Sequence, residues 1–228
     1  MITSKLNIVR NGLFAFRFSF LASLLLVATG LTSCSEDDDT NSDNEYSNWE
    51  SRNNEYFESV YQQAKTAIDA GDNSWFMIKS YSKDNSEGAH TDYVVVHVLS
   101  QDLEHDEVES FGSLPSPEYT DTVRVHYRGN LMPSASYSDG YQFDSSWQGS
   151  YDLSAMVPSK FAVNGLVNGF ATAVMRMHVG DRWKVYVPWK LGYGSSSSSS
   201  SIPNYSTLVF DLTLHSFGKP GSAMPSFQ

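Results

Sequence analysis

The 228-residue sequence is poor in cysteine and in positive charge. Its one cysteine, Cys34, has no second thiol with which to form an internal disulfide bond. Lysine and arginine together number 15 against 26 aspartates and glutamates, which gives a formal net charge of −11 at pH 7. Because an acidic surface repels phosphate backbones and the basic residues form no cluster, we expect no nucleic acid among the partners.

Motifs of most enzyme classes are also missing. The sequence has no glycine-rich phosphate loop, no nucleophile elbow and no Ser/His/Asp signature. The six histidines are scattered, without ligand spacing or an accompanying cysteine pair, so we expect neither a metal site nor a cofactor. They are His90, His97, His105, His126, His178 and His215.

The chain has one long apolar run, near its amino terminus. Lys5, Arg10 and Arg17 are followed by an almost wholly apolar stretch from Phe18 to Leu31. A basic segment before a short apolar run is typical of a secretory signal peptide, and this run is short for a membrane-spanning helix. Residues 1–33 are therefore predicted to be a signal peptide.

The apolar run ends in Leu31-Thr32-Ser33-Cys34, which resembles the lipobox of bacterial lipoproteins. This resemblance implies cleavage before Cys34 and acylation of its thiol and of the new amino terminus, so that a lipid would hold the protein at a membrane. The alternative is an uncleaved signal anchor with an incidental cysteine. Cleavage would change the net charge to −14, because residues 1–33 carry three positive charges and no acids.

Acidic residues follow the cysteine directly, from Glu36 to Asp39. Residues 34–46 are predicted to be a solvated tether, since such a run cannot collapse onto itself. Cys-Ser followed by several acids also resembles the export signal of some Gram-negative surface lipoproteins. We therefore expect a lipid-anchored protein of the bacterial cell envelope, in the outer membrane or at the cell surface.

Residues 47–90 are predicted to form a helical extension. An apolar stripe at helical spacing predicts a helix from about Asn48 to Ala70, with Gly71 as its stop and Ser47-x-x-Glu50 as a capping box. The stripe consists of Trp49, Phe57, Val60, Ala64 and Ile68. We expect this stripe to pack on the chain's own domain, and the alternative is contact with a partner such as a second copy.

Beyond the helix the sequence indicates short strands around one short helix. A short element is predicted at Trp75–Ile78, strands at Tyr93–Leu99, Val123–Arg128, Tyr141–Asp144, Phe161–Val163, Trp183–Val187 and Thr207–Phe217, and the helix at Val167–Met177. This order predicts an α+β fold with a mostly antiparallel sheet over residues 91–218. Residues 219–228 are expected to be a C-terminal tail.

Six short sequence blocks follow one another between about Asp121 and Phe217. They are Val125-His126-Tyr127-x-Gly129, Gly140-x-x-Phe143-Asp144-Ser145-Ser146, Gly165-Leu166-Val167-x-Gly169-Phe170, Met177-x-x-Gly180, Val187-Pro188-x-x-Leu191-Gly192-Tyr193-Gly194 and Ile202-Pro203-Asn204-x-x-Thr207-Leu208-x-Phe210. In order and spacing they resemble FKBP-type peptidyl-prolyl cis-trans isomerases. The resemblance implies an antiparallel sheet wrapped around a short helix, and isomerisation of X–Pro bonds in proline-containing polypeptides without a metal or cofactor.

The same resemblance implies the site residues. The catalytic set would be Tyr127, Phe143, Asp144, Tyr193 and Phe210, and the substrate-binding set would be Leu166, Val167, Phe170 and Ile202. Phe170 would form the floor of an aromatic pocket, where the family more often has tryptophan. Asp144 would be directed at the substrate carbonyl region, Tyr193 would donate from its hydroxyl, and the Val167 amide would pair with the ligand.

The chain departs from the family pattern in three places. Trp147-Gln148-Gly149 stands where small members have an arginine paired with the aspartate, so Asp144 is expected to have another partner. Gly149–Lys160 is several residues longer than usual and is expected to reshape one rim of the site. The serine run Ser195–Ser201 replaces a hydrophobic lip and is expected to be a mobile surface loop.

Three functions fit these residues. The first is an active prolyl isomerase that assists the folding of exported proteins, and the second is a folding helper whose isomerisation is incidental. The third is a noncatalytic surface module that uses its aromatic residues for another ligand. The retained Asp144, Tyr193 and Phe210 favour the first, while the client proteins and the oligomeric state are left open.

Overall fold

The computed structural model describes residues 45–83, 88–100, 115–197 and 200–224. The predicted signal peptide, Cys34 and nearly all of the predicted tether lie outside the described residues, as do residues 101–114, part of the serine run and the last four residues. Among the residues that are described, no helix combines the length and apolar character needed to cross a membrane.

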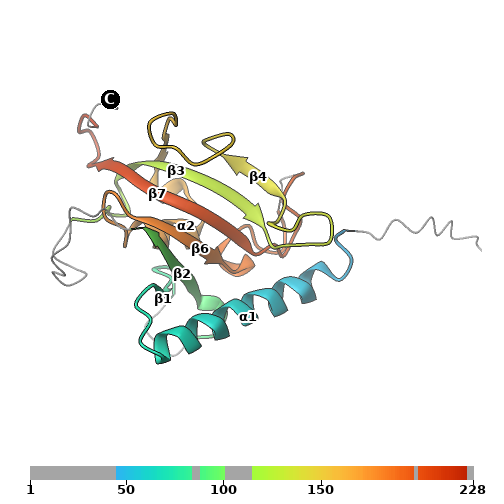
Figure 1. Ribbon diagram of the computed structural model, residues 1–228. Helices are drawn as coiled ribbons and strands as arrows, with labels where there is room; N and C mark the ends of the chain where they lie inside the picture. The colour runs from blue at the N-terminus through green and yellow to red at the C-terminus, as the bar shows by residue number, and fades with distance from the viewer. Residues whose placement is uncertain (1–44, 84–87, 101–114, 198–199, 225–228) are drawn as a thin grey trace, which may run out of the picture. The chain divides into compact units, whose positions relative to one another are not determined.

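In the described part of the chain, seven antiparallel strands form one sheet in the order β1-β2-β6-β7-β3-β4, with β5 also paired to β3 (Figure 1). The strands are β1 Trp75–Lys79, β2 Tyr93–Ser100, β3 Thr122–Leu131, β4 Gln142–Ser145, β5 Ser159–Ala162, β6 Arg182–Val187 and β7 Leu208–Gly218. Helix α1 spans Trp49–Asp69, α2 spans Asn168–Val174, and 3-10 turns cover His90–Asp92, Val163–Gly165 and Trp189–Leu191. The predicted α+β fold, with an antiparallel sheet around a short helix and a preceding N-terminal helix, is confirmed.

One face of the sheet packs on α2. Successive side chains of a strand point to opposite faces, so the alternating apolar positions of β3, β6 and β7 form one continuous buried surface. Those that point toward α2 include Val125, Val185 and Leu212, all fully buried. The helix itself is buried from Gly169 to Val174, so its sequence is mostly apolar, and the hydroxyl of its one buried polar residue, Thr172, donates to the Asn168 carbonyl at 2.7 Å.

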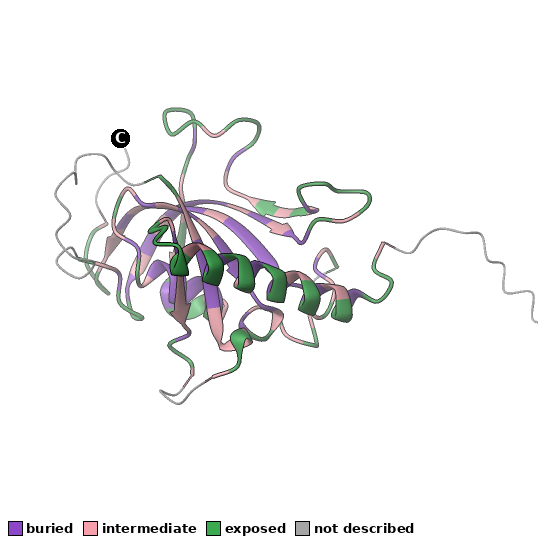
Figure 2. Ribbon diagram, turned by 60° about the horizontal axis from the view of Figure 1, so that its bottom comes forward, coloured by how far each residue is buried: buried purple, intermediate pink, exposed green. Residues whose placement is uncertain are grey.

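The opposite face of the sheet is covered by α1. Its Phe57, Val60 and Ala64 pack against Val95 of β2, Tyr186 of β6 and Val209 of β7. Figure 2 shows the buried side of α1 turned toward the sheet and its outer side exposed. The prediction that the stripe packs on its own domain is therefore confirmed for Trp49, Phe57, Val60 and Ala64, but it is wrong for Ile68, which is 39% exposed near the end of the helix. The segment predicted as a helical extension also supplies β1, a strand of the same sheet.

The predicted start of α1 near Asn48 is confirmed, but the predicted capping box is wrong. No capping box forms at Ser47, and the N-cap is Asn48 in the left-handed region, with φ of 51° and no side-chain cap. Asparagine tolerates this conformation better than most residues. The guanidinium of Arg52 donates instead to the carbonyl oxygens of Glu45 and Ser47, at 2.8 and 3.3 Å.

The predicted stop of α1 at Gly71 is confirmed. Gly71 has a φ of 83°, and its amide donates to the Ile68 carbonyl at 2.9 Å, while the Asp72 amide donates to the Ala67 carbonyl at 3.0 Å. A left-handed residue after the last turn satisfies helix carbonyls in this way, and glycine adopts it without a Cβ clash.

The long segment between β4 and β5 folds over the sheet face opposite α2. Trp147 and Met156 are buried, and the Tyr151 hydroxyl lies 2.8 Å from the hydroxyl of Thr213. The guanidinium of Arg182 sits 3.5 Å from the centroid of the Tyr151 ring. Thr213 follows Leu212 in β7, and consecutive residues of a strand point to opposite faces of the sheet. Because Leu212 faces α2, the contacts of Thr213 lie on the other side of the sheet from that helix. The extra residues thus cover the back of the sheet, rather than only a rim of the predicted site.

Candidate active site

Four of the predicted aromatic residues meet between α2 and the sheet. The Phe170 ring of α2 lies 4.9 Å from Phe210 of β7 and 6.2 Å from Tyr127 of β3, measured between ring centroids. Phe143 of β4 lies 5.8 Å from Phe210. All of these pairs are edge-to-face, the arrangement that aromatic quadrupoles favour.

Two further residues shape this cluster and were missed by the sequence analysis. Phe161 of β5 lies 5.5 Å from Tyr127 and 6.5 Å from Phe170, again edge-to-face. Gly129 lies beneath Phe143, and a Cβ at Gly129 would come within 2.5 Å of the Phe143 ring. Phe161 lies in a segment that was predicted to be a strand, and the structure pairs it with Val123 of β3. The alternation of side chains along that strand was therefore the signal that could have placed Phe161 on the same face as the site. The need for glycine could not be seen before the ring was placed.

Asp144 is held at the edge of the ring cluster. The Tyr127 hydroxyl donates to its Oδ2 at 2.6 Å, and the Ser145 amide donates to its Oδ1 at 2.8 Å. The carboxylate is exposed, whereas Tyr127 is only 8% exposed. The side-chain partner of Asp144 is thus Tyr127, which agrees with the expectation of a partner other than an arginine.

The nearby basic residue, Arg128, points elsewhere. Its guanidinium donates to the Gly149 carbonyl at 2.9 Å and lies 4.7 Å from the centroid of the Trp147 ring. It therefore braces the segment after β4, on the opposite side of β3 from Tyr127.

Burial and the charge of Asp144 keep both tyrosines of the site protonated. The pKa of Tyr127 is raised far above its usual value, first by burial and then by its hydrogen bond to Asp144. Burial, together with the charge of Asp144, also raises the pKa of Tyr193. Each phenol is thus a neutral hydrogen-bond donor throughout the physiological range.

The other predicted residues line the same region in different ways. Ile202 is buried in the hydrophobic cluster that contains the rings, and Leu166 and Val167 pack against it, half-buried. Val167 caps α2, where its carbonyl accepts from the Ala171 amide at 3.0 Å. Tyr193 is 47% exposed and follows the 3-10 turn Trp189–Leu191. The structure thus joins four of the nine predicted residues in one ring cluster and places Ile202, Leu166 and Val167 in or against the same hydrophobic core, and the roles of all nine stay predictions.

Comparison with known proteins bears on the same segment. Residues 115–215 match the family model of FKBP-type peptidyl-prolyl cis-trans isomerases. The FKBP-type 22 kDa peptidyl-prolyl cis-trans isomerase of Escherichia coli (strain K12) is 41% identical over 98 residues, which cover 43% of this chain and 42% of that protein. FkpA, an FKBP-type isomerase of Aeromonas hydrophila, is 36% identical over 116 residues, covering 51% and 38%. These findings support the FKBP-type family.

The chain spans less than half the length of these two relatives. Among solved structures, a peptidyl-prolyl cis-trans isomerase from Pseudomonas syringae pv. tomato aligns with a TM-score of 0.44 and 20% identity, over 71% of this chain and 96% of that one. The FKBP-type match contains every predicted site residue of the aromatic cluster, whereas α1 lies outside it.

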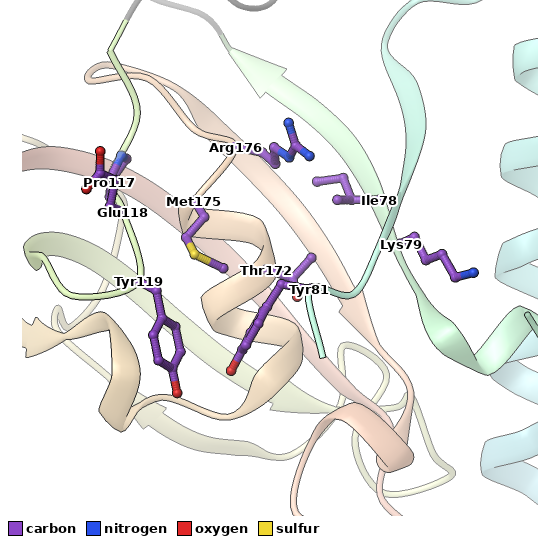
Figure 3. Close-up of a pocket in the computed structure, with 9 residues that line it drawn as sticks. All are labelled: Ile78, Lys79, Tyr81, Pro117, Glu118, Tyr119, Thr172, Met175 and Arg176. Carbon is purple, nitrogen blue, oxygen red and sulfur yellow. The ribbon is translucent and has the colours of Figure 1, made fainter. Parts of the chain in front are cut away.

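A pocket of about 330 Å³ lies on the side of α2 that faces β1 (Figure 3). It is lined by Ile78, Lys79, Tyr81, Pro117, Glu118, Tyr119, Thr172, Met175 and Arg176, and by none of the predicted site residues. The Tyr81 hydroxyl donates to Asn168 at 2.9 Å, at the start of α2. No group of three or more metal-ligating side chains occurs anywhere in the described ranges.

Proposed function

We propose that this protein is a peptidyl-prolyl cis-trans isomerase of the FKBP type, acting on proline-containing polypeptides. The observation that carries the proposal is the 2.6 Å hydrogen bond from Tyr127 to Asp144 at the edge of the ring cluster. It supports the proposal because these two residues and the rings of Phe143, Phe170 and Phe210 lie within the segment that matches the family. Tyr127 and Asp144 leave a polar group beside an otherwise apolar surface.

The reaction asks for a surface that favours a twisted amide. The X–Pro bond has partial double-bond character, with a rotation barrier of about 18–20 kcal/mol, and isomerises unaided in tens to hundreds of seconds. Halfway through the rotation, resonance is lost and the carbonyl is less polar than in either planar form. Apolar rings such as Phe170 and Phe210 would therefore stabilise the twisted amide relative to the planar ones, which is differential binding of the transition state.

Asp144 would act on the substrate as a negative charge held in a fixed orientation. With Oδ2 occupied by the Tyr127 hydroxyl and Oδ1 by the Ser145 amide, its carboxylate cannot rotate freely. A fixed carboxylate places negative charge beside the carbonyl carbon of the bound amide without a reorganisation cost at the moment of rotation. Tyr193, whose pKa is raised by burial and then by the charge of Asp144, is available to donate to a substrate carbonyl oxygen.

We further propose that the protein is lipid-anchored through Cys34 in the bacterial cell envelope and assists the folding of exported proteins there. The support is the sequence before and after Cys34. Mass spectrometry of the protein purified from membranes would test this, with acyl chains expected on residue 34 and residues 1–33 absent. An unmodified Cys34 in a chain that retains residues 1–33 would contradict the proposed anchor.

Isomerase activity is tested by NMR exchange on a short Ala-X-Pro-Phe peptide with catalytic amounts of the full-length chain. We expect cis–trans exchange well above the uncatalysed rate, and a loss of about tenfold or more in the Asp144→Val variant, equivalent to about 1.4 kcal/mol of transition-state stabilisation. The matched control is Asp152→Val, an exposed aspartate in the same part of the chain. A folded parent with no catalysis would favour the binding-module alternative.

A further inference from the structure

Residues 192–207 form a connection that carries two predicted site residues. It runs from the 3-10 turn Trp189–Leu191 to β7 and includes Tyr193 near its start and Ile202 near its end. Its two ends, called here the first root (near Gly194) and the second root (near Tyr205), are joined to each other, since the Tyr205 amide donates to the Gly194 carbonyl at 2.9 Å. The rings of Trp189 and Tyr205 also meet edge-to-face at 5.0 Å.

The second root of this connection is fastened to the first turns of α1. The Trp49 indole donates to the Ser206 hydroxyl at 2.9 Å, and the Thr207 amide donates to the Asn53 Oδ1 at 2.7 Å. The Thr207 hydroxyl donates to the Asn53 carbonyl at 3.3 Å. Each of these bonds joins segments more than 150 residues apart in sequence, and each is buried.

The first root is fastened to the same stretch of α1. The Trp189 indole donates to the Asn54 Oδ1 at 2.8 Å, at an exposed position next to Asn53. Both ends of the connection between Tyr193 and Ile202 are therefore tied to residues 49–54 of one helix.

Asn53 is a buried polar residue among the apolar residues of α1. It is fully buried on the apolar face of α1, where an unpaired amide would be costly. Its side chain is satisfied on both sides, because its Nδ2 donates to the Trp49 carbonyl at 2.7 Å while its Oδ1 accepts from Thr207. An apolar residue would serve packing alone, so the amide serves to fix where the chain enters β7, three residues before Phe210.

We propose that Trp49, Asn53 and Asn54 are positioning residues of the isomerase site: α1 sets the placement of Tyr193 and Ile202 by holding both roots of residues 192–207. This inference rests on the proposed function. It gives the N-terminal helix, which lies outside the family match, a part in substrate binding at the other end of the sequence.

The test compares Asn53→Ala, Trp49→Phe and Asn54→Ala with the parent in the full-length chain. Trp49→Phe keeps an aromatic ring while it removes the indole donor and part of the buried ring system, and Asn54 is exposed, so these two variants are expected to fold. We expect Asn53→Ala to lower kcat/KM by about tenfold and the other two by a few-fold, chiefly through KM. The Ile202 methyl and Tyr193 ring resonances should shift in NMR spectra, while those of Val123 and Val125 in β3 stay in place.

Val60→Ala is the matched control, because Val60 is buried on the same helix face but packs only on the sheet side. It should lower the melting temperature as Asn53→Ala does and keep kcat/KM within twofold of the parent below that temperature. Variants of Asn53 and Trp49 that melt earlier but keep kcat/KM and the Ile202 and Tyr193 resonances would overturn the inference. The resonances decide it even if the parent shows no turnover, which would contradict only the proposed function.

Discussion

Tyr127 contributes both a buried ring and a hydrogen-bond donor to the site. Its ring is buried among Phe161 and Phe170, while its hydroxyl reaches the edge of the cluster and donates to Asp144. The sequence pattern identified both residues but not their hydrogen bond, because a bond between β3 and β4 depends on the register of the two strands. The register sets Gly129 opposite Asp144, so the carboxylate lies within reach of the hydroxyl of Tyr127, two residues earlier in β3.

Removing that hydroxyl isolates its contribution. Tyr127→Phe keeps the ring in the cluster and leaves Asp144 without one of its donors, so its carboxylate gains freedom. We expect kcat/KM for an Ala-X-Pro-Phe peptide to fall by about fivefold to tenfold, and the free energy of unfolding to fall by about 1 kcal/mol, the usual worth of one hydrogen bond. Unchanged kinetics in the folded variant would show that the orientation of Asp144 does not matter for the reaction.

His126 gives the fold a dependence on pH. It is 1% exposed on the sheet face opposite Tyr127, and its ring meets that of His215 at 5.7 Å. Burial, and then the neighbouring His215, lower the pKa of His126 to about 4. The unfolded chain binds a proton at this residue near pH 6.5, so unfolding takes up a proton between pH 6.5 and 4, and stability falls as the pH falls through that window.

A His126→Leu variant tests this assignment. Urea unfolding at pH 7 and pH 5 should show that the parent loses more stability on acidification than the variant does, by on the order of 1 kcal/mol. The comparison uses only the difference between the two pH values, so any packing change in the variant cancels. Equal losses in the two proteins would mean that His126 titrates normally in the folded state.

At the scale of elements, α1 was the clearest part of the sequence. Its stripe repeats over five turns, and the burial of Phe57, Val60 and Ala64 follows from that period alone. Its predicted start near Asn48 is confirmed, but the predicted capping box at Ser47 is wrong, because Arg52 and the contact of Trp49 with Ser206 hold this end of the helix. Buried Asn53 gave no signal either, since its partner Thr207 is distant in sequence and becomes visible only when the two segments are placed together.

Phe57 is the residue through which the docking of α1 is best measured. Its ring is 2% exposed and lies at the centre of the contact with β2, β6 and β7. Phe57→Ala should lower the free energy of unfolding by about 3–5 kcal/mol, because it removes a large buried ring and leaves a cavity. Glu55→Ala, at an exposed position of the same helix, should change it by less than about 0.5 kcal/mol.

A loss below about 1 kcal/mol in Phe57→Ala would mean that α1 is not packed on the sheet in solution. In that event the tie between α1 and residues 192–207 would also lose its basis, since Trp49 and Asn53 lie about two turns and one turn before Phe57 on the same helix face.

At the scale of the whole molecule, the two faces of the sheet differ in what they contact. The face toward α2 carries the ring cluster and the predicted site, and the other face is covered by α1 and by the segment after β4. The order of the sequence blocks was enough to predict the fold, and it named a set of site residues whose roles stay predictions. It could not show that the longer Gly149–Lys160 segment covers the back of the sheet, because its contacts with Thr213 and Arg182 depend on the closed sheet.

The central claim is that X–Pro isomerisation takes place at the ring cluster, and kcat/KM of Phe210→Leu against Leu214→Val tests it most directly. Both changes shorten a fully or nearly fully buried side chain on the α2-facing side of β7, so both lower stability, but only Phe210 lies among the site rings. In the full-length chain at a temperature where both variants are folded, the account predicts a loss of about tenfold or more for Phe210→Leu and less than about twofold for Leu214→Val. Equal kcat/KM in Phe210→Leu and the parent would contradict the account.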